Sequence, residues 1–181
     1  MIKIGLASDH AGFELKEFIK NHIVEKGYIC IDFGAYSAES CDYPDFAHLL
    51  AGAVEAGEIG ETGEIGEAGE AGEIGETGKG KQLFSYSVIQ STLRVDLGIA
   101  LCGSGNGIGM TLNKHQGIRA AICWNVEVAK VVRAHNDANI LVLPARFISR
   151  EEAIAMIDTF LSTPFEGGRH QRRIEKIPLS R

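Results

Sequence analysis

Short apolar runs recur along the chain and predict five β-strands. Each run is bounded by Gly, Asp or Asn, and each is short enough to be a buried strand rather than a buried helix. The runs occupy residues 2–8, 28–34, 96–102, 118–124 and 139–145.

Helical patterns lie between these runs, with apolar residues three or four positions apart. They occupy residues 15–23, 46–54, 128–135 and 154–161. Strands that alternate with helices pair in parallel through right-handed crossovers. We therefore predict an α/β fold, a three-layer α/β/α sandwich with a doubly wound, Rossmann-like sheet of five parallel strands. Ligands of such sheets bind at the carboxyl ends of the strands.

One stretch of low complexity interrupts the alternation. Residues 55–78 are eight consecutive E-x-G triplets, whose glycines and repelling glutamates favour a flexible, solvated insertion. We place this insertion at about 55–95 within a single domain spanning residues 1–181. The apolar stretch 82–95 is predicted to pack locally, as a strand or as a helix.

Glycine at every third position is also typical of collagen, and GETGKGK resembles the start of a P-loop. The absence of proline from the triplets and Gln82 at the Ser/Thr position argue against both.

Composition limits the classes of protein to which the chain can belong. A chain of 181 residues, 45% of them hydrophobic, has room for one core. The formal charge of −6 comes from residues 55–81, which hold the eight glutamates of the triplets together with Lys79 and Lys81, because the remainder has 16 acidic and 16 basic residues. That neutral remainder, without aromatic residues interleaved in its basic tail, argues against nucleic-acid binding. The chain has neither a signal-peptide pattern nor an apolar run of 18 residues, so we expect a cytoplasmic protein without a membrane contact.

The four cysteines show no zinc-binding or C-x-x-C spacing. They are Cys30, Cys41, Cys102 and Cys123, and we expect free thiols in a reducing compartment. Cys30 and Cys123 lie inside strand runs and are predicted to be core residues.

A glycine-rich loop follows the third predicted strand. Residues 101–110 read LCGSGNGIGM, and neither register fits the G-x-G-x-x-G dinucleotide fingerprint. Either the glycines only permit a tight turn, or the start of the following helix binds an anion or a developing oxyanion. We favour the anion site, because the loop has more glycines than a turn requires. Cys102 ends the strand; it is either a core residue or, since a helix N-terminus favours a thiolate, a base or nucleophile.

Three further polar clusters are expected at the same edge of the sheet. They are Asp9-His10 after the first strand, HND at 135–137 at the end of the helix predicted over 128–135, and the tail GGRHQRRIEKI at 167–177. Arg169 and Arg173 are four residues apart, which puts them on one helical face as a fork suited to phosphate. Each cluster also has a structural explanation: a helix cap, a helix C-terminus, or a solvated basic face.

Together these motifs resemble the type B ribose-5-phosphate isomerases. The matching segments are SDHAG, DYPDFA, CGSGNGIG, HND-x-N and EGGRHQRRIE, in this order and over nearly the whole chain except 55–95. The resemblance implies an enzyme of the pentose phosphate pathway that interconverts ribose 5-phosphate and ribulose 5-phosphate. It also implies no metal and no cofactor, and a homodimer or tetramer with the active site between subunits.

The resemblance assigns roles to individual residues. Cys102 matches the base that moves a proton between C2 and C1, His135 matches the ring-opening acid/base, and Ser104 helps to hold the enediolate. Arg146 and Asn136 are expected to come from the partner subunit. The implied substrate contacts are Asp9, His10, Tyr43, Gly103, Gly105, Asn106, Gly107, Asn136, Arg146, Arg169 and Arg173.

One position departs from the family pattern. Some members have a glutamate base directly after SGNG, where this chain has Ile108, which cannot accept a proton. The departure favours Cys102 as the base and leaves the substrate open, because related isomerases act on allose 6-phosphate or galactose 6-phosphate. A non-catalytic, flavodoxin-like module that binds a phosphorylated ligand remains the alternative of another class; it would need neither Cys102 nor His135.

Overall fold

All five predicted strands form, and they pair into one parallel sheet. The computed structural model describes residues 1–59 and 93–179. The sheet order is β2-β1-β3-β5-β4, with every neighbouring pair parallel. The strands are β1 (Lys3–Ser8), β2 (Ile29–Asp32), β3 (Leu97–Cys102), β4 (Ala120–Ile122) and β5 (Ile140–Pro144).

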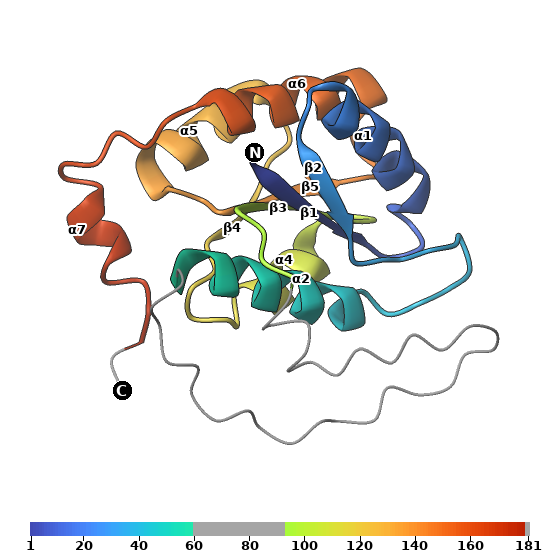
Figure 1. Ribbon diagram of the computed structural model, residues 1–181, viewed down its shortest axis with the longest axis horizontal. Helices are drawn as coiled ribbons and strands as arrows, with labels where there is room; N and C mark the ends of the chain where they lie inside the picture. Colours follow the sequence, from blue (N-terminus) through green and yellow to red (C-terminus); the bar gives the residue numbers. More distant parts are fainter. Residues whose placement is uncertain (60–92, 180–181) are drawn as a thin grey trace.

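Helices cover both faces of the sheet, as Figure 1 shows. Helices α1, α5 and α6 lie on one face, and α2 and α4 lie on the other. The predicted three-layer sandwich is confirmed. Across the described ranges, no helix combines the length and apolar character needed to span a bilayer. The helices are α1 (Phe13–Glu25), α2 (Tyr43–Ile59), α4 (Asn106–Leu112), α5 (Val126–Asn136), α6 (Arg150–Ser162) and α7 (Gln171–Ile174).

The core has two halves, one on each side of the sheet. Ile99 and Leu101 of β3 pack with α1, α5 and α6, whereas Ala100 and Cys102 of the same strand pack with α2 and α4. Side chains alternate across a strand, so β3 is apolar at every position only because both of its faces are covered. This explains why the central strands appear in the sequence as continuous apolar runs.

The parallel strands begin at one side of the sheet and end at the other, and we call these two sides the amino edge and the carboxyl edge. Gly98 pairs with Ile140 at the amino edge, and Cys102 pairs with Pro144 at the carboxyl edge. Four residues of strand separate these pairs, a distance of about 13 Å at ~3.3 Å per residue. Each helix that follows a strand returns the chain from the carboxyl edge to the amino edge. A residue at the end of such a helix therefore lies far from a residue at the end of the strand before it.

The predicted insertion is shorter at both ends than the sequence indicates. Helix α2 continues to Ile59, and Glu55, inside the first E-x-G triplet, accepts a hydrogen bond from the backbone N of Gly117 (2.9 Å). At the other end, Val95 is buried and its backbone N donates to the carbonyl of Ala53 (3.2 Å). The remaining stretch of the predicted insertion lies outside the described residues, as does most of the predicted local element at 82–95.

Replacing residues 60–92 with a short Gly-Ser turn is expected to leave the fold intact. Gly57 of α2 lies against the carbonyl of Val95, so the two ends to be joined are close together. The composition of the E-x-G triplets offers too little apolar surface to offset an ordering cost of about 1–2 kcal/mol per residue. Thermal unfolding of the shortened chain should give a Tm within a few degrees of that of the full chain. A fall of many degrees would show that 82–92 packs on the body.

Candidate active site

The glycine-rich loop lies at the carboxyl edge of the sheet and leads into α4, as predicted. Gly105 has φ +76° and serves as the N-cap of α4. A Cβ atom on Gly107 would lie 2.5 Å from Cζ of Tyr43, so the Tyr43 ring rests on the backbone of the loop. Geometry thus accounts for glycine at 105 and 107, and the number of glycines alone does not indicate an anion site. The close approach does bring the Tyr43 hydroxyl to the loop.

Cys102 is the last residue of β3 and is buried, with 4% of its surface exposed. Its carbonyl accepts a hydrogen bond from the N of Ala145 (3.0 Å), and the carbonyl of Gly103 accepts one from the N of Arg146 (3.1 Å). The segment after β5 is thereby fixed against the end of β3. Ser104 is exposed, and its Oγ accepts a bond from the N of Asn106 at 3.4 Å.

Asp9 and His10 follow β1 at the same edge. Asp9 Oδ1 accepts from the backbone N of Ala11 (2.9 Å) and of Gly12 (3.1 Å), so this carboxylate closes the turn that precedes α1. It is not the helix cap considered from the sequence, because Gly12 is the N-cap residue of α1 and no side chain caps the helix there. Its own N donates to the carbonyl of Leu101 (3.3 Å), next to Cys102. His10 Nδ1 lies 3.3 Å from both the N and the O of Cys41, so the backbone holds the imidazole in place.

Arg146 belongs to the carboxyl edge as well. A Cβ atom on Gly103 would lie 3.4 Å from Cδ and Nε of Arg146, so the exposed arginine side chain runs along the glycine-rich loop of its own chain. The sequence predicts that a partner subunit contributes this residue. Within the chain, its guanidinium group lies against Gly103, the residue that follows Cys102, and the contribution from a partner subunit stays a prediction.

The other cysteines differ from Cys102 in their surroundings. All four thiols are free, as predicted. Burial raises the pKa of Cys30 to about 11 and the pKa of Cys123 to about 12, so neither supplies a thiolate at neutral pH. Loss of solvent contact also raises the pKa of Cys41. Cys102, in contrast, is the last residue of β3 and directly precedes the glycines of the loop.

His135 and Asn136 lie at the opposite edge of the sheet, which corrects the prediction that all polar clusters share one edge. Helix α5 begins after β4 at the carboxyl edge and ends at Asn136, three residues before the amino edge, where the carbonyl of Asn139 accepts from the N of Gly98. The helix ends as expected, and Asp137, its C-cap residue, adopts the left-handed conformation (φ 45°). Within one chain, His135 is therefore separated from Cys102 by about the length of a strand.

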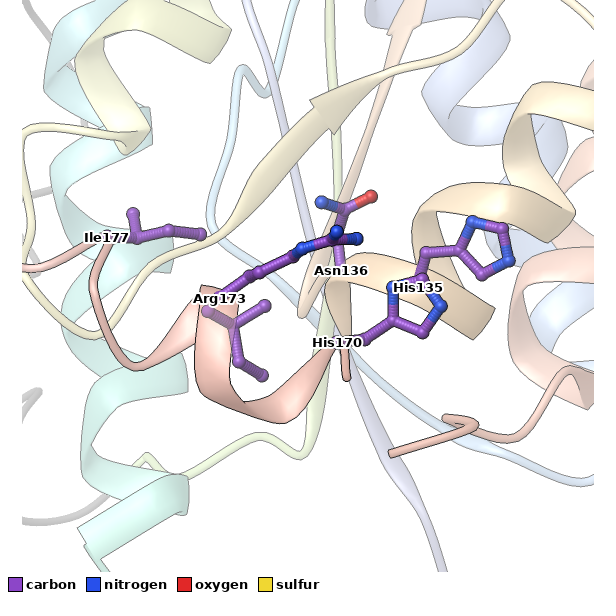
Figure 2. A pocket seen from close by; sticks show the side chains of 6 residues that line it. His135, Asn136, His170, Arg173 and Ile177 are labelled. Atoms are coloured by element: carbon purple, nitrogen blue, oxygen red, sulfur yellow. The ribbon is translucent and has the colours of Figure 1, made fainter. Parts of the chain in front are cut away.

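A pocket of about 390 Å³ lies beside His135, and Figure 2 shows the side chains that line it. Asn136 and Arg173 contribute an amide and a guanidinium group. Helix α7 contains only four residues and begins at Gln171, so Arg169 precedes it. The predicted fork on one helical face does not form; Arg169 is instead exposed in the turn before α7. The lining residues are His135, Asn136, His170, Arg173, Ile174 and Ile177.

Two residues in this region were not predicted as site residues. The His170 ring stacks on the His135 ring, with centroids 4.3 Å apart and planes 4° apart. Glu166 Oε2 lies 3.6 Å from Nε2 of His135 and 3.9 Å from Nε2 of His170. Desolvation and then the neighbouring His135 and Arg169 lower the pKa of His170. The four-residue spacing of Glu166 and His170 in the tail is the only sign of this cluster in the sequence.

Ile108 is fully buried in the core between the sheet and α2. The side chain at the position where some type B isomerases have a glutamate is therefore a packing residue. No proton acceptor stands at this position, so Cys102 is the remaining candidate base on the loop.

The chain is similar to known proteins over nearly its whole length. The sequence model of the family described as Ribose/Galactose Isomerase matches residues 4–69 and 84–177. Ribose-5-phosphate isomerase B of Escherichia coli is 37% identical over 177 residues, covering 98% of this chain and 95% of the relative. The crystal structure of a ribose 5-phosphate isomerase from Thermotoga maritima is 42% identical with a TM-score of 0.77, covering 98% of this chain and 97% of that one.

A second solved structure includes a ligand. Ribose-5-phosphate isomerase B from Mycoplasma genitalium, crystallised with bound ribulose 5-phosphate, is 35% identical with a TM-score of 0.73. It covers 97% of this chain, and this chain covers 93% of it.

Proposed function

The chain belongs to the ribose/galactose isomerase family, and from this membership we propose that it interconverts ribose 5-phosphate and ribulose 5-phosphate. The reaction is an aldose–ketose isomerisation, and its place would be the non-oxidative pentose phosphate pathway. Relatives with this name cover nearly the whole chain, and one of them was crystallised with ribulose 5-phosphate. The observation that carries the proposal is Cys102 at the start of a glycine-rich loop against which Tyr43 and Arg146 lie.

The chemistry assigns one role to each side chain. His135 donates a proton to the ring oxygen as the C1 hydroxyl loses its own, which opens the furanose. Cys102, as a thiolate, removes the C2 proton and returns it to C1, while the hydroxyl proton on O2 moves to O1. Ser104 and the amides of residues 103–107 stabilise the enediolate oxygens between these two steps. Asp9 and Tyr43 bind sugar hydroxyls, and no metal or cofactor takes part.

We propose that the complete site forms between two chains. The edge with Cys102, Asp9 and His10 and the edge with His135 and Arg173 are about 13 Å apart along the strands, too far for one sugar phosphate to contact both in one chain. A second copy in a two-fold dimer can place its amino edge against the carboxyl edge of the first. The partner would then supply His135, Asn136, Arg169 and Arg173, whereas Arg146 would act within its own chain. A tetramer would contain two such dimers.

Substrate choice is tested by offering three sugars to the purified protein. Ribose 5-phosphate, allose 6-phosphate and galactose 6-phosphate are each supplied in a coupled assay. The proposal expects the highest kcat/KM with ribose 5-phosphate. A higher kcat/KM with either six-carbon sugar would contradict the proposed substrate and leave the proposed aldose–ketose isomerisation standing. Binding of all three without turnover would favour a phospholigand-binding module, for which Cys102 and His135 have no chemical use.

Replacing Arg173 with alanine is expected to raise the Kd for ribose 5-phosphate about tenfold or more and to change kcat little. A guanidinium group that holds the phosphate equally in the ground state and the transition state contributes uniform binding. Calorimetric binding and steady-state kinetics measure the two effects. Arg172→Ala is the matched control, because Arg172 is the exposed neighbour in α7 and does not line the pocket. A collapse of kcat with unchanged Kd would contradict the assignment.

We also propose a cytoplasmic location. The four free cysteines suit a reducing compartment, and the substrates are phosphorylated intermediates.

A further inference from the structure

Three potential metal ligands converge at the amino edge of the sheet. His135 comes from the end of α5, Glu166 from the segment after α6, and His170 from the turn before α7. One donor atom from each lies within 4.8 Å of the others. Figure 2 shows the His135 and His170 rings side by side at the pocket.

We propose that His135, Glu166 and His170 bind a divalent transition-metal ion such as Zn²⁺, and that the bound ion inhibits the enzyme. Two imidazoles and one carboxylate are a donor set of catalytic zinc sites, which keep a fourth position open. Bond lengths of about 2.0–2.1 Å place ligand atoms around a tetrahedral ion roughly 3.3 Å apart. The Oε2 atom of Glu166 is already 3.6 Å and 3.9 Å from the two Nε2 atoms.

The backbone fixes the two segments that carry the ligands. The N of Glu166 donates to the carbonyl of Ala134 (3.0 Å), which joins the tail to the end of α5. The N of His170 donates to the carbonyl of Gly167 (3.1 Å), and Gly167 has a positive φ of 65° that closes the turn. The ligands therefore converge through main-chain hydrogen bonds, and binding requires only side-chain movement.

Three side chains move to complete the coordination. The stacked rings are parallel, so one ring has to tilt until both planes contain the ion. The His135 side chain, with 37% of its surface exposed, has space to tilt. Arg169 Nε lies 3.5 Å from Nε2 of His170, at the limit of a hydrogen bond, and the exposed arginine can turn toward solvent. Glu166 is 59% exposed, so its carboxylate can close on the ion.

The inhibitory effect rests on the proposed function. If His135 opens the sugar ring, an ion on its Nε2 occupies the lone pair that proton transfer needs. Asn136 and Arg173 line the same pocket, so the ion and the sugar phosphate compete for one place. The ion is thus an inhibitor of a reaction that needs no metal.

Metal binding is tested without reference to activity. The full chain is freed of metal with EDTA and titrated with Zn²⁺ by calorimetry and with Co²⁺ by visible absorption, which reports four-coordinate geometry. One ion per chain is expected. Glu166→Gln and His170→Asn should each weaken binding at least about tenfold, the loss that even an outer partner of a metal site causes. His48→Ala is the control, because His48 pairs with His115 (2.8 Å) away from this pocket.

Activity then separates the two proposals. Zn²⁺ should lower turnover of the unmodified chain, EDTA should restore it, and Glu166→Gln should need at least about ten times more Zn²⁺ relative to its own metal-free rate. Ion binding that is unchanged in Glu166→Gln and His170→Asn, or that is lost in His48→Ala, would overturn the site. Ion binding as expected in a protein without isomerase activity would overturn the proposed function and leave the metal site standing.

Discussion

Replacing Cys102 with alanine is expected to lower isomerase turnover about a hundredfold or more while ribose 5-phosphate still binds. The variant removes the general base from the end of β3 but leaves the glycine-rich loop, Tyr43 and Arg146 in place. No carboxylate can replace the thiolate on the loop, because Ile108 occupies the position of the family glutamate and is buried. Steady-state turnover and calorimetric binding separate the two effects.

Cys30→Ala is the matched control for this variant. Cys30 is a half-buried cysteine on β2, and burial raises its pKa to about 11. The control should retain near-normal turnover, which would show that loss of a thiol does not by itself inactivate the protein. Circular dichroism and Tm confirm that both variants fold. Near-normal turnover of Cys102→Ala would exclude Cys102 as the base.

The alternation of apolar runs and helical patterns predicts the fold because each element is constrained by its neighbours. Strands β3 and β5 are covered on both faces, so their sequences are continuously apolar and easily recognised. Helix α2 is predicted only in part. Its last turn contains the first E-x-G triplet, whose composition favours a loop, yet Glu55 is fixed there by Gly117 and by His115 (3.3 Å). Tertiary contacts override local composition at that point.

The candidate site is predicted residue by residue, but its arrangement within one chain is not. The polar motifs are expected to bind one substrate, which suggests that they share one edge of the sheet. Cys102 instead lies at the end of a strand and His135 near the end of a helix that returns to the other edge, so the two lie apart. The direction is implicit in the fold, because a crossover helix ends where the next strand begins. The contacts between individual side chains are harder to predict from the sequence than the direction of the chain. The close approach of Tyr43 to Gly107 and the stacking of His170 on His135 depend on the packing of segments far apart in the chain.

A mixed dimer of two inactive variants is expected to recover activity. Cys102→Ala and His135→Asn should each lower turnover of their homodimers about a hundredfold or more. If each site combines Cys102 of one chain with His135 of the other, the heterodimer of these variants has one intact site and one site with both substitutions. Isolated heterodimer, prepared with two different affinity tags, should therefore turn over at about half the rate of the unsubstituted dimer, since a two-fold dimer has two equivalent sites.

The converse heterodimer distinguishes a shared site from a site within one chain. One chain is unsubstituted and the other contains both Cys102→Ala and His135→Asn. A shared site predicts almost no activity, because each of the two sites lacks one of the two groups. A site within one chain predicts the reverse: about half activity here, from the intact chain, and none in the heterodimer of single variants. The opposite sheet edges occupied by Cys102 and His135 favour the first outcome, and the second would require the chain to bring these edges together by refolding α5.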